Sequence, residues 1–259
     1  MEPSLIAVAL LLAGLVGVSL GLLGGGGSIL TVPILTYVLG MEAREAIAAS
    51  LFIVGATSAV SMVAHAKAGR VRWRTGLIFG AAGMVGAFLG GLLGGLIPGA
   101  VLMVLFALMM IATASAMIRG RKTAQPVGQS SPQTFRILIY GLLVGVATGL
   151  VGAGGGFLIV PALNLLGGLP MTVAVGTSLL VIAMKSAAGL GGYLFSVQLN
   201  WPIVLAFTAV AIAGSFAGAS LAGRIPERAL RRGFGVFVLV MGAFVLFQEL
   251  PGIVSSLTV

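Results

Sequence analysis

Two clusters of glycine have a composition and spacing that suit binding of a ligand in apolar surroundings. Each cluster precedes a short apolar segment, and the residues concerned are Gly24, Gly25, Gly26, Gly27 and Ser28 in the first cluster, and Gly152, Gly154, Gly155 and Gly156 in the second. Glycine permits tight turns and leaves backbone N–H groups unobstructed. If each short segment is a helix, its N-terminus offers free N–H donors and a positive dipole end. We therefore predict an anion site with little formal charge; the alternative is that the glycines only permit close helix crossing.

Lys185 is a basic residue near the middle of an apolar run, residues 174–195, whereas almost every other basic residue lies at the end of a run or between runs. A lysine at the bilayer midplane is costly and usually faces an interior cavity. We predict that it attracts an anionic substrate or carries a proton by alternating between charged and neutral forms. The alternative is a lysine that extends to the membrane interface.

Small hydroxyl side chains add a third set of candidates, namely Ser50, Thr57 and Ser58 in the first half and Thr177, Ser178 and Ser186 in the second, of which Ser50 and Ser178 are favoured because they recur at matched positions. Their O–H groups can donate hydrogen bonds to the oxygens of an anionic substrate. Serine and threonine in membrane helices also bond to their own backbone or join helices together. His65, at the basic end of an apolar run, is interpreted as interfacial.

Composition identifies the environment of these residues. The chain has 259 residues, of which 59% are hydrophobic and 7% are charged, so it is built for lipid. Its net charge of +9 is divided among short basic clusters between apolar runs, which excludes nucleic acid as the expected partner. There is no cysteine, and the five acidic residues are glutamates at the ends of runs or between them. We expect no metal site, no cofactor and no catalytic residues; a Ser–Lys dyad of Lys185 with Ser178 or Ser186 is the enzymatic alternative.

Eight apolar segments are long enough, or nearly so, to cross about 30 Å of hydrocarbon. They lie at residues 4–23, 46–66, 75–96, 100–118, 135–152, 174–195, 203–222 and 229–249. Two shorter apolar pieces, 28–39 and 156–168, follow the glycine clusters and are interpreted as half-helices, re-entrant elements or short tilted spans. The predicted fold class is an all-α polytopic membrane protein.

The two halves of the chain repeat each other with a constant offset of 128 residues (161 − 33, 201 − 73). The matched pairs are Gly24/Gly152, Pro33/Pro161, Ser50/Ser178, Trp73/Trp201, Gly86/Gly214, Pro98/Pro226 and Phe106/Phe234. A polar and basic stretch separates the halves. We predict a first transmembrane repeat at 1–118, a basic cytoplasmic linker at 119–134 and a second transmembrane repeat at 135–259.

Charge indicates how the repeats are oriented, because clustered Lys and Arg prefer the cytoplasmic side. Residues 67–74 are basic, whereas their equivalents at 195–202 are neutral; the loop around Pro98 is neutral, whereas its equivalent at 224–232 is basic. Reciprocal bias of this kind is typical of inverted-topology repeats. It favours five plus five elements, counting the short pieces. A parallel four-plus-four arrangement is the alternative.

The segments GLLGGGGSILTVPIL at 21–35 and GLVGAGGGFLIVPAL at 149–163 resemble the duplicated motif of the TauE/SafE sulfite exporter family. Each is followed by a serine-containing segment, AIAASLF at 46–52 and AVGTSLL at 174–180, as in that family. The resemblance extends over essentially the whole chain. It implies transport of sulfur-containing anions such as sulfite, sulfoacetate or other organosulfonates, although members of the family differ in substrate.

These observations predict a multi-pass transporter of the cell (inner) membrane, with a small anion held at the midplane between the two repeats. The expected partners are that anion and membrane lipid. Small residues at four-residue spacing in 86–95 and 214–223 suit packing within the bundle, which we favour, or the seam of a homodimer. The alternative functions are transport of a different small anion or solute, and a non-transporting membrane subunit.

Overall fold

The structure, a computed structural model, describes residues 3–119, 132–151, 156–166, 168–221 and 226–257, and within these ranges every regular element is a helix. The eight long helices are α1 (Pro3–Leu23), α3 (Ala43–Lys67), α4 (Trp73–Gly94), α5 (Gly99–Arg119), α6 (Pro132–Val151), α8 (Met171–Tyr193), α9 (Trp201–Leu221) and α10 (Glu227–Leu257). The predicted all-α fold class is therefore confirmed. Helix α10 extends eight residues beyond the predicted end at 249, to Leu257, since Pro251 does not end the helix.

Within the described residues, α3, α4, α8 and α9 are long and apolar enough to cross a membrane. Many large apolar side chains on the helices and the loops between them are exposed, and the most exposed include Leu11, Leu96, Phe195 and Phe247, each at least 75% exposed. Water-soluble proteins rarely expose apolar surface on this scale, whereas a bilayer solvates it. The outer surface is thus suited to lipid.

Two short helices follow the glycine clusters, as the sequence predicts. Helix α2 (Gly26–Pro33) continues into the π-helical segment η1 (Ile34–Val38), and α7 (Gly156–Pro161) continues into η2 (Ala162–Leu166). Both transitions occur directly after a proline, Pro33 or Pro161, and proline lacks the N–H group that a regular helix would use. The two repeats therefore contain the same broken element. Gly24, between α1 and α2, has a φ of +71°, a conformation that favours glycine.

The first helix of each half packs against the fourth helix of the other half. Helix α1 lies along α9, where a Cβ at Gly17 would overlap the backbone of Ala211. Helix α6 lies along α4 in the same way, where a Cβ at Gly145 would overlap the backbone of Gly83. Both pairs of contacts are related by the offset of 128 residues. The small-residue runs of α4 and α9 thus serve packing within the bundle.

Helices α3 and α8, which the duplication makes equivalent, run in opposite directions at the centre of the bundle. Gly55 contacts Ser186, whereas Gly176, nearer the start of α8, contacts His65, nearer the end of α3. From the first contact to the second, the residue number rises along α3 and falls along α8, so the two helices are antiparallel. This register places Thr57 within about one residue of its own equivalent, Lys185. Equivalent positions of the two repeats are therefore level with each other at this point of the helix pair.

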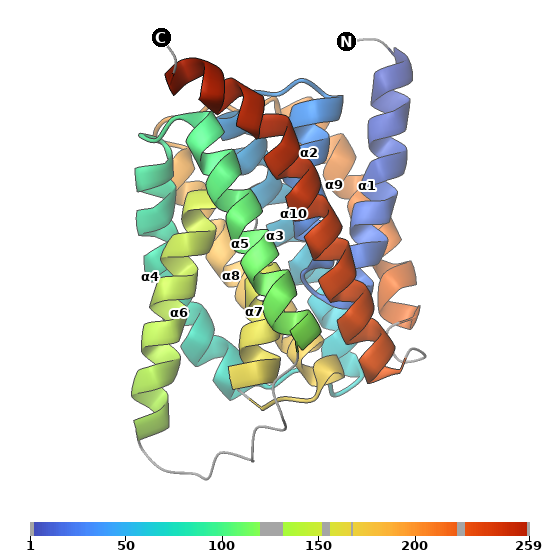
Figure 1. Cartoon of the computed structure of the whole chain (residues 1–259). Helices are drawn as coiled ribbons and strands as arrows, with labels where there is room; N and C mark the ends of the chain where they lie inside the picture. Colours follow the sequence, from blue (N-terminus) through green and yellow to red (C-terminus); the bar gives the residue numbers. More distant parts are fainter. Residues whose placement is uncertain (1–2, 120–131, 152–155, 167, 222–225, 258–259) are drawn as a thin grey trace.

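Figure 1 shows both termini at one end of the bundle and the end of α5 and the start of α6 at the other. Helices α5 and α10 pack together on one side and run in opposite directions in this view. Of the predicted linker, residues 120–131 lie outside the described residues, while Arg119 ends α5 and Pro132 begins α6. The division of the chain into repeats at 118 and 135 stays a prediction.

Candidate functional site

The two broken elements meet at their glycine-led ends. A Cβ at Gly25 would overlap the backbone of Gly156, and a Cβ at Gly156 would overlap the backbone of Gly25. Only glycine fits on both sides of this contact. Helix α2 starts at Gly26 and α7 starts at Gly156, so the ends of both short helices that lack intrahelical N–H partners lie at one junction. Gly25 caps α2 without any side-chain hydrogen bond.

Two of the predicted hydroxyl residues lie at this glycine junction. A Cβ at Gly24 would lie 2.7 Å from the Oγ of Ser178. The Ser178 hydroxyl donates a hydrogen bond of 2.7 Å to the Val175 carbonyl, and the Ser28 hydroxyl donates one of 2.7 Å to the Gly25 carbonyl. Each oxygen keeps lone pairs but has already used its proton. For these serines to bind an anion as donors, the hydroxyl groups must rotate away from their backbone acceptors.

Other predicted residues occupy different positions. The backbone N–H of Arg72 donates a hydrogen bond of 3.0 Å to the Thr177 hydroxyl, which holds the loop between α3 and α4 against α8. The Ser50 hydroxyl donates to the Ile47 carbonyl at 2.9 Å within α3. Gly26 and Gly27 form the first turn of α2, whereas Gly154 and Gly155 lie outside the described residues. The substrate-binding role of all these residues stays a prediction.

Lys185 is only 1% exposed and lies where α8 faces α4 and α6. Its methylene groups fill the space beside Gly83, and its Nζ lies 3.4 Å from the Val144 carbonyl oxygen of α6. That distance is long for a hydrogen bond, and an ammonium group has three donors. Gly83 explains why the long side chain fits, since a Cβ there would lie 2.7 Å from the Lys185 Cδ.

Buried hydroxyl groups without partners surround the crossing of α3 and α8. The Oγ1 of Thr57 and the Oγ atoms of Ser58 and Ser186 are all buried, and none has a hydrogen-bond partner within the described part of the chain. An unpaired buried polar group costs free energy, and in a native protein it calls for an explanation such as an absent ligand or water. All three belong to the hydroxyl candidates that the sequence offered, and their role in binding stays a prediction.

Helix α3 carries two further residues that the sequence-based site omitted. Ser61 and His65 follow Thr57 at four-residue spacing, so the three side chains lie on one face of the helix. The Ser61 Oγ and the His65 Nδ1 are also buried without a partner in the described residues. His65 is 1% exposed, so its ring is packed inside the protein; its predicted position at the membrane interface stays a prediction. The four-residue spacing of polar groups in an apolar helix was the signal that could have identified this face.

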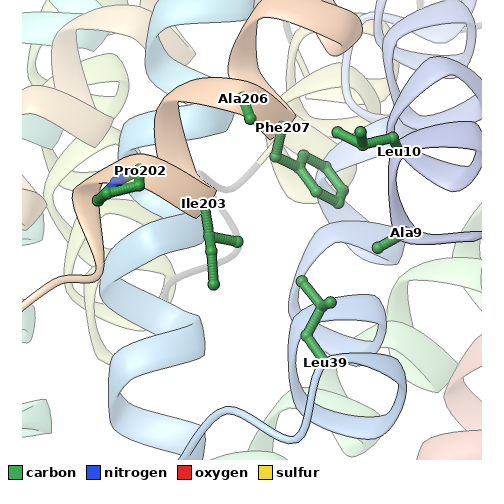
Figure 2. A pocket seen from close by; sticks show the side chains of 7 residues that line it. All are labelled: Ala9, Leu10, Leu39, Pro202, Ile203, Ala206 and Phe207. Carbon is green, nitrogen blue, oxygen red and sulfur yellow. The ribbon is translucent and has the colours of Figure 1, made fainter. Parts of the chain in front are cut away.

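A separate apolar groove lies between α1 and α9 (Figure 2). It is lined by Ala9, Leu10, Leu39, Pro202, Ile203, Ala206 and Phe207 and has a volume of about 220 Å³. None of the predicted site residues contributes to it. Its apolar lining suits a hydrocarbon chain rather than a charged solute.

The described residues therefore include a buried lysine between α8, α4 and α6, unpartnered hydroxyl groups along α3 and α8, and two glycine-led helix ends that meet each other. Within the described residues, no three potential metal ligands of the His, Cys, Asp or Glu type come together. A helical membrane protein with duplicated broken helices and buried polar groups is typical of membrane transporters.

The chain belongs to the sulfite exporter TauE/SafE family, whose model matches residues 9–245. A probable membrane transporter protein of Xylella fastidiosa is 37% identical over 249 residues, which cover 93% of this chain and 95% of that relative. A probable membrane transporter protein of Methanocaldococcus jannaschii is 28% identical over 257 residues, covering 93% and 96% of the two chains. No solved structure matches the chain. Family and relatives agree that the chain is a membrane transporter.

Proposed function

We propose that this transporter carries small sulfur-containing anions, such as sulfite, sulfoacetate or other organosulfonates, and holds them at the midplane between its two repeats. The observation that carries the proposal is the buried Lys185 ammonium, whose contact in the described structure is a single long one to a neutral carbonyl. A buried cation without a carboxylate partner is stabilised by an anion that enters from outside. The family description, which names sulfite, supports the chemical class of that anion.

The hydroxyls of Thr57, Ser58 and Ser186 complete this anion site. An oxyanion accepts several hydrogen bonds, and these buried side chains offer donors that no protein acceptor uses in the described residues. A polar site that pairs a substrate oxygen with each donor discriminates strongly against analogues that lack that oxygen. The glycine-led ends of α2 and α7 then contribute N–H groups on the side of Ser178.

We also propose that the two repeats have the inverted orientation that the charge pattern predicts. An inverted arrangement of five plus five elements is supported by the antiparallel course of the equivalent helices α3 and α8. It is also supported by Figure 1, in which the end of α5 and the start of α6 lie at the end of the bundle opposite to both termini, as an odd number of elements per half requires. In this arrangement the chain crosses the inner membrane several times, and one repeat moves relative to the other during alternating access.

The test is anion flux into proteoliposomes that contain the purified chain alone. Sulfite, sulfoacetate, a taurine-like sulfonate and sulfate are compared for the unmodified chain, for Lys185→Met and for Lys67→Met. Lys67 is an exposed lysine at the end of α3 and is the matched control. We expect saturable flux of at least one sulfur anion, reduced by at least tenfold in Lys185→Met and nearly unchanged in Lys67→Met.

Each other outcome contradicts a defined part of the proposal. Flux that persists in Lys185→Met would remove Lys185 from the site and leave the glycine junction. Flux of other anions with no flux of sulfur anions would place the substrate in a different class. Absence of any flux from the chain alone would favour a subunit that needs a partner.

A further inference from the structure

The His65 ring has a defined hydrogen-bonding state. Its Nε2 lies 3.0 Å from the carbonyl oxygen of Gly21, in the last turn of α1. A carbonyl oxygen can only accept a hydrogen bond, so Nε2 carries the proton. In the neutral ring Nδ1 is then unprotonated and can only accept a hydrogen bond. It is buried without a partner among the described residues.

The surroundings of His65 are cationic. The ring lies in the last turn of α3, and the backbone N–H of Arg70 donates a hydrogen bond of 2.9 Å to the His65 carbonyl. Arg70 is also the charged side chain that interacts electrostatically with the ring. A second proton on the ring would therefore add a positive charge to a site that is already positive. That charge is tolerated when an anion is present.

Within the described part of the chain, no carboxylate that would neutralise the ring lies in its neighbourhood. The elements packed against α3 are α1, α2, η1, α5, α8 and α9. Their ionisable side chains within the described residues are Tyr37 of η1, Arg119 of α5, and Lys185 and Tyr193 of α8. On α3 itself the acidic residue is Glu45, in the first turn at the opposite end of the helix. The anion that balances a protonated His65 must therefore come from outside the protein.

Ser61 provides a donor beside the ring. It precedes His65 by one helical turn, so the two side chains are neighbours on the surface of α3. Its buried Oγ has no partner in the described structure. When the ring is protonated, Nδ1–H and the Ser61 hydroxyl form a pair of donors on one face, between the basic loop and Thr57.

We propose that His65 and Ser61 form a second binding position for a small oxyanion, on the route between the basic loop and Lys185. Binding of the anion at this position favours protonation of the ring, and protonation of the ring favours binding of the anion. The ring takes the proton from a hydronium ion at the loop, and the anion balances the new charge, so a monovalent anion and its proton enter this position without net charge. The proposal rests on the proposed function, since it places a step of anion entry in the same transporter.

The test uses the fact that His65 is the only histidine in the chain. Labelling with ¹⁵N-histidine therefore gives the imidazole signals of one residue in the intact, bilayer-embedded protein. The pH at which half of Nδ1 is protonated is measured with chloride alone and then with sulfite, sulfate and inorganic phosphate in turn. The same titration is repeated with Lys185→Met and with Tyr193→Phe, which changes the residue equivalent to His65 in the second repeat.

We expect at least one oxyanion to raise that midpoint by about one pH unit, which corresponds to about tenfold tighter binding of the anion to the protonated ring. The shift should persist in Lys185→Met, because the second position does not include Lys185, and in Tyr193→Phe. A midpoint that no oxyanion moves would overturn the proposal, whether or not the protein transports sulfur anions. A shift that disappears in Lys185→Met would also overturn it, because the anion would then act from the central site.

Discussion

The backbone of Gly25 lies directly against the backbone of Gly156, so the two repeats touch through their glycine-led helix ends. The two residues are not equivalent by the offset of 128, but each belongs to one copy of the same glycine cluster. The contact leaves no room for a Cβ on either side. In the proposed transport cycle, movement of one repeat relative to the other must therefore open or slide this junction.

Substitution of either glycine at the junction should destabilise the protein. Gly25→Ala and Gly156→Ala each place a methyl group within the opposite backbone, and overpacking of this kind costs about 1–3 kcal/mol. Thermal unfolding in detergent would record a lower Tm for both variants. Gly233→Ala is the control, because a Cβ there meets nothing within 4 Å. Unchanged Tm values for Gly25→Ala and Gly156→Ala would contradict the close contact.

Thr57→Val should separate stability from transport. The substitution keeps the shape of the side chain and removes a buried hydroxyl that has no partner in the described residues, so folding stability should stay the same or rise. Flux of the sulfur anion should fall, because a donor at the proposed site is lost.

Thr208→Val is the matched control for Thr57→Val. The Thr208 hydroxyl donates a hydrogen bond of 2.6 Å to the Val204 carbonyl, and loss of that bond should cost about 1 kcal/mol without a specific loss of flux. Full flux in Thr57→Val, measured at equal amounts of folded protein, would exclude its hydroxyl from the site.

Tyr193→Phe should weaken one of two equivalent attachments between helices. The Tyr193 hydroxyl donates a hydrogen bond of 2.5 Å to the Leu150 carbonyl in the last turn of α6, whereas His65, its equivalent, bonds to Gly21 in the last turn of α1. Removing the hydroxyl should lower the free energy of unfolding by about 1 kcal/mol. Chemical denaturation would measure the change, and Tyr140→Phe, at an exposed tyrosine, is the control. Equal losses in the two variants would argue against this attachment.

Single introduced cysteines should report the orientation of the repeats, because the chain has no cysteine of its own. Arg72→Cys and Arg232→Cys should react with an impermeant thiol reagent from the same side of the membrane, and Gln198→Cys should react from the opposite side. Each protein is labelled in sealed vesicles and again after permeabilisation. Reaction of Arg72→Cys and Arg232→Cys from opposite sides would exclude the inverted arrangement and favour parallel repeats.

The sequence by itself determined the class of fold and the broken elements. Apolar runs of helical length, the glycine clusters and the matched Pro33 and Pro161 are local features, and a helix forms its backbone hydrogen bonds within its own segment. The observed α2 and α7 therefore begin within the predicted short pieces or two residues before them. The offset of 128 residues likewise indicated which helices are equivalent.

Only the tertiary structure decided which polar groups are buried together. His65 lies near the end of a helix, where a histidine usually meets the interface, but α1 and α8 cover it. Thr177 is committed to the Arg72 N–H across 105 positions of sequence, and Lys185 extends toward Val144 of α6. The physical reason is that burial and hydrogen-bond partners depend on which helix faces pack together. In lipid, where almost every face is apolar, hydropathy does not distinguish a face that contacts protein from one that contacts the membrane.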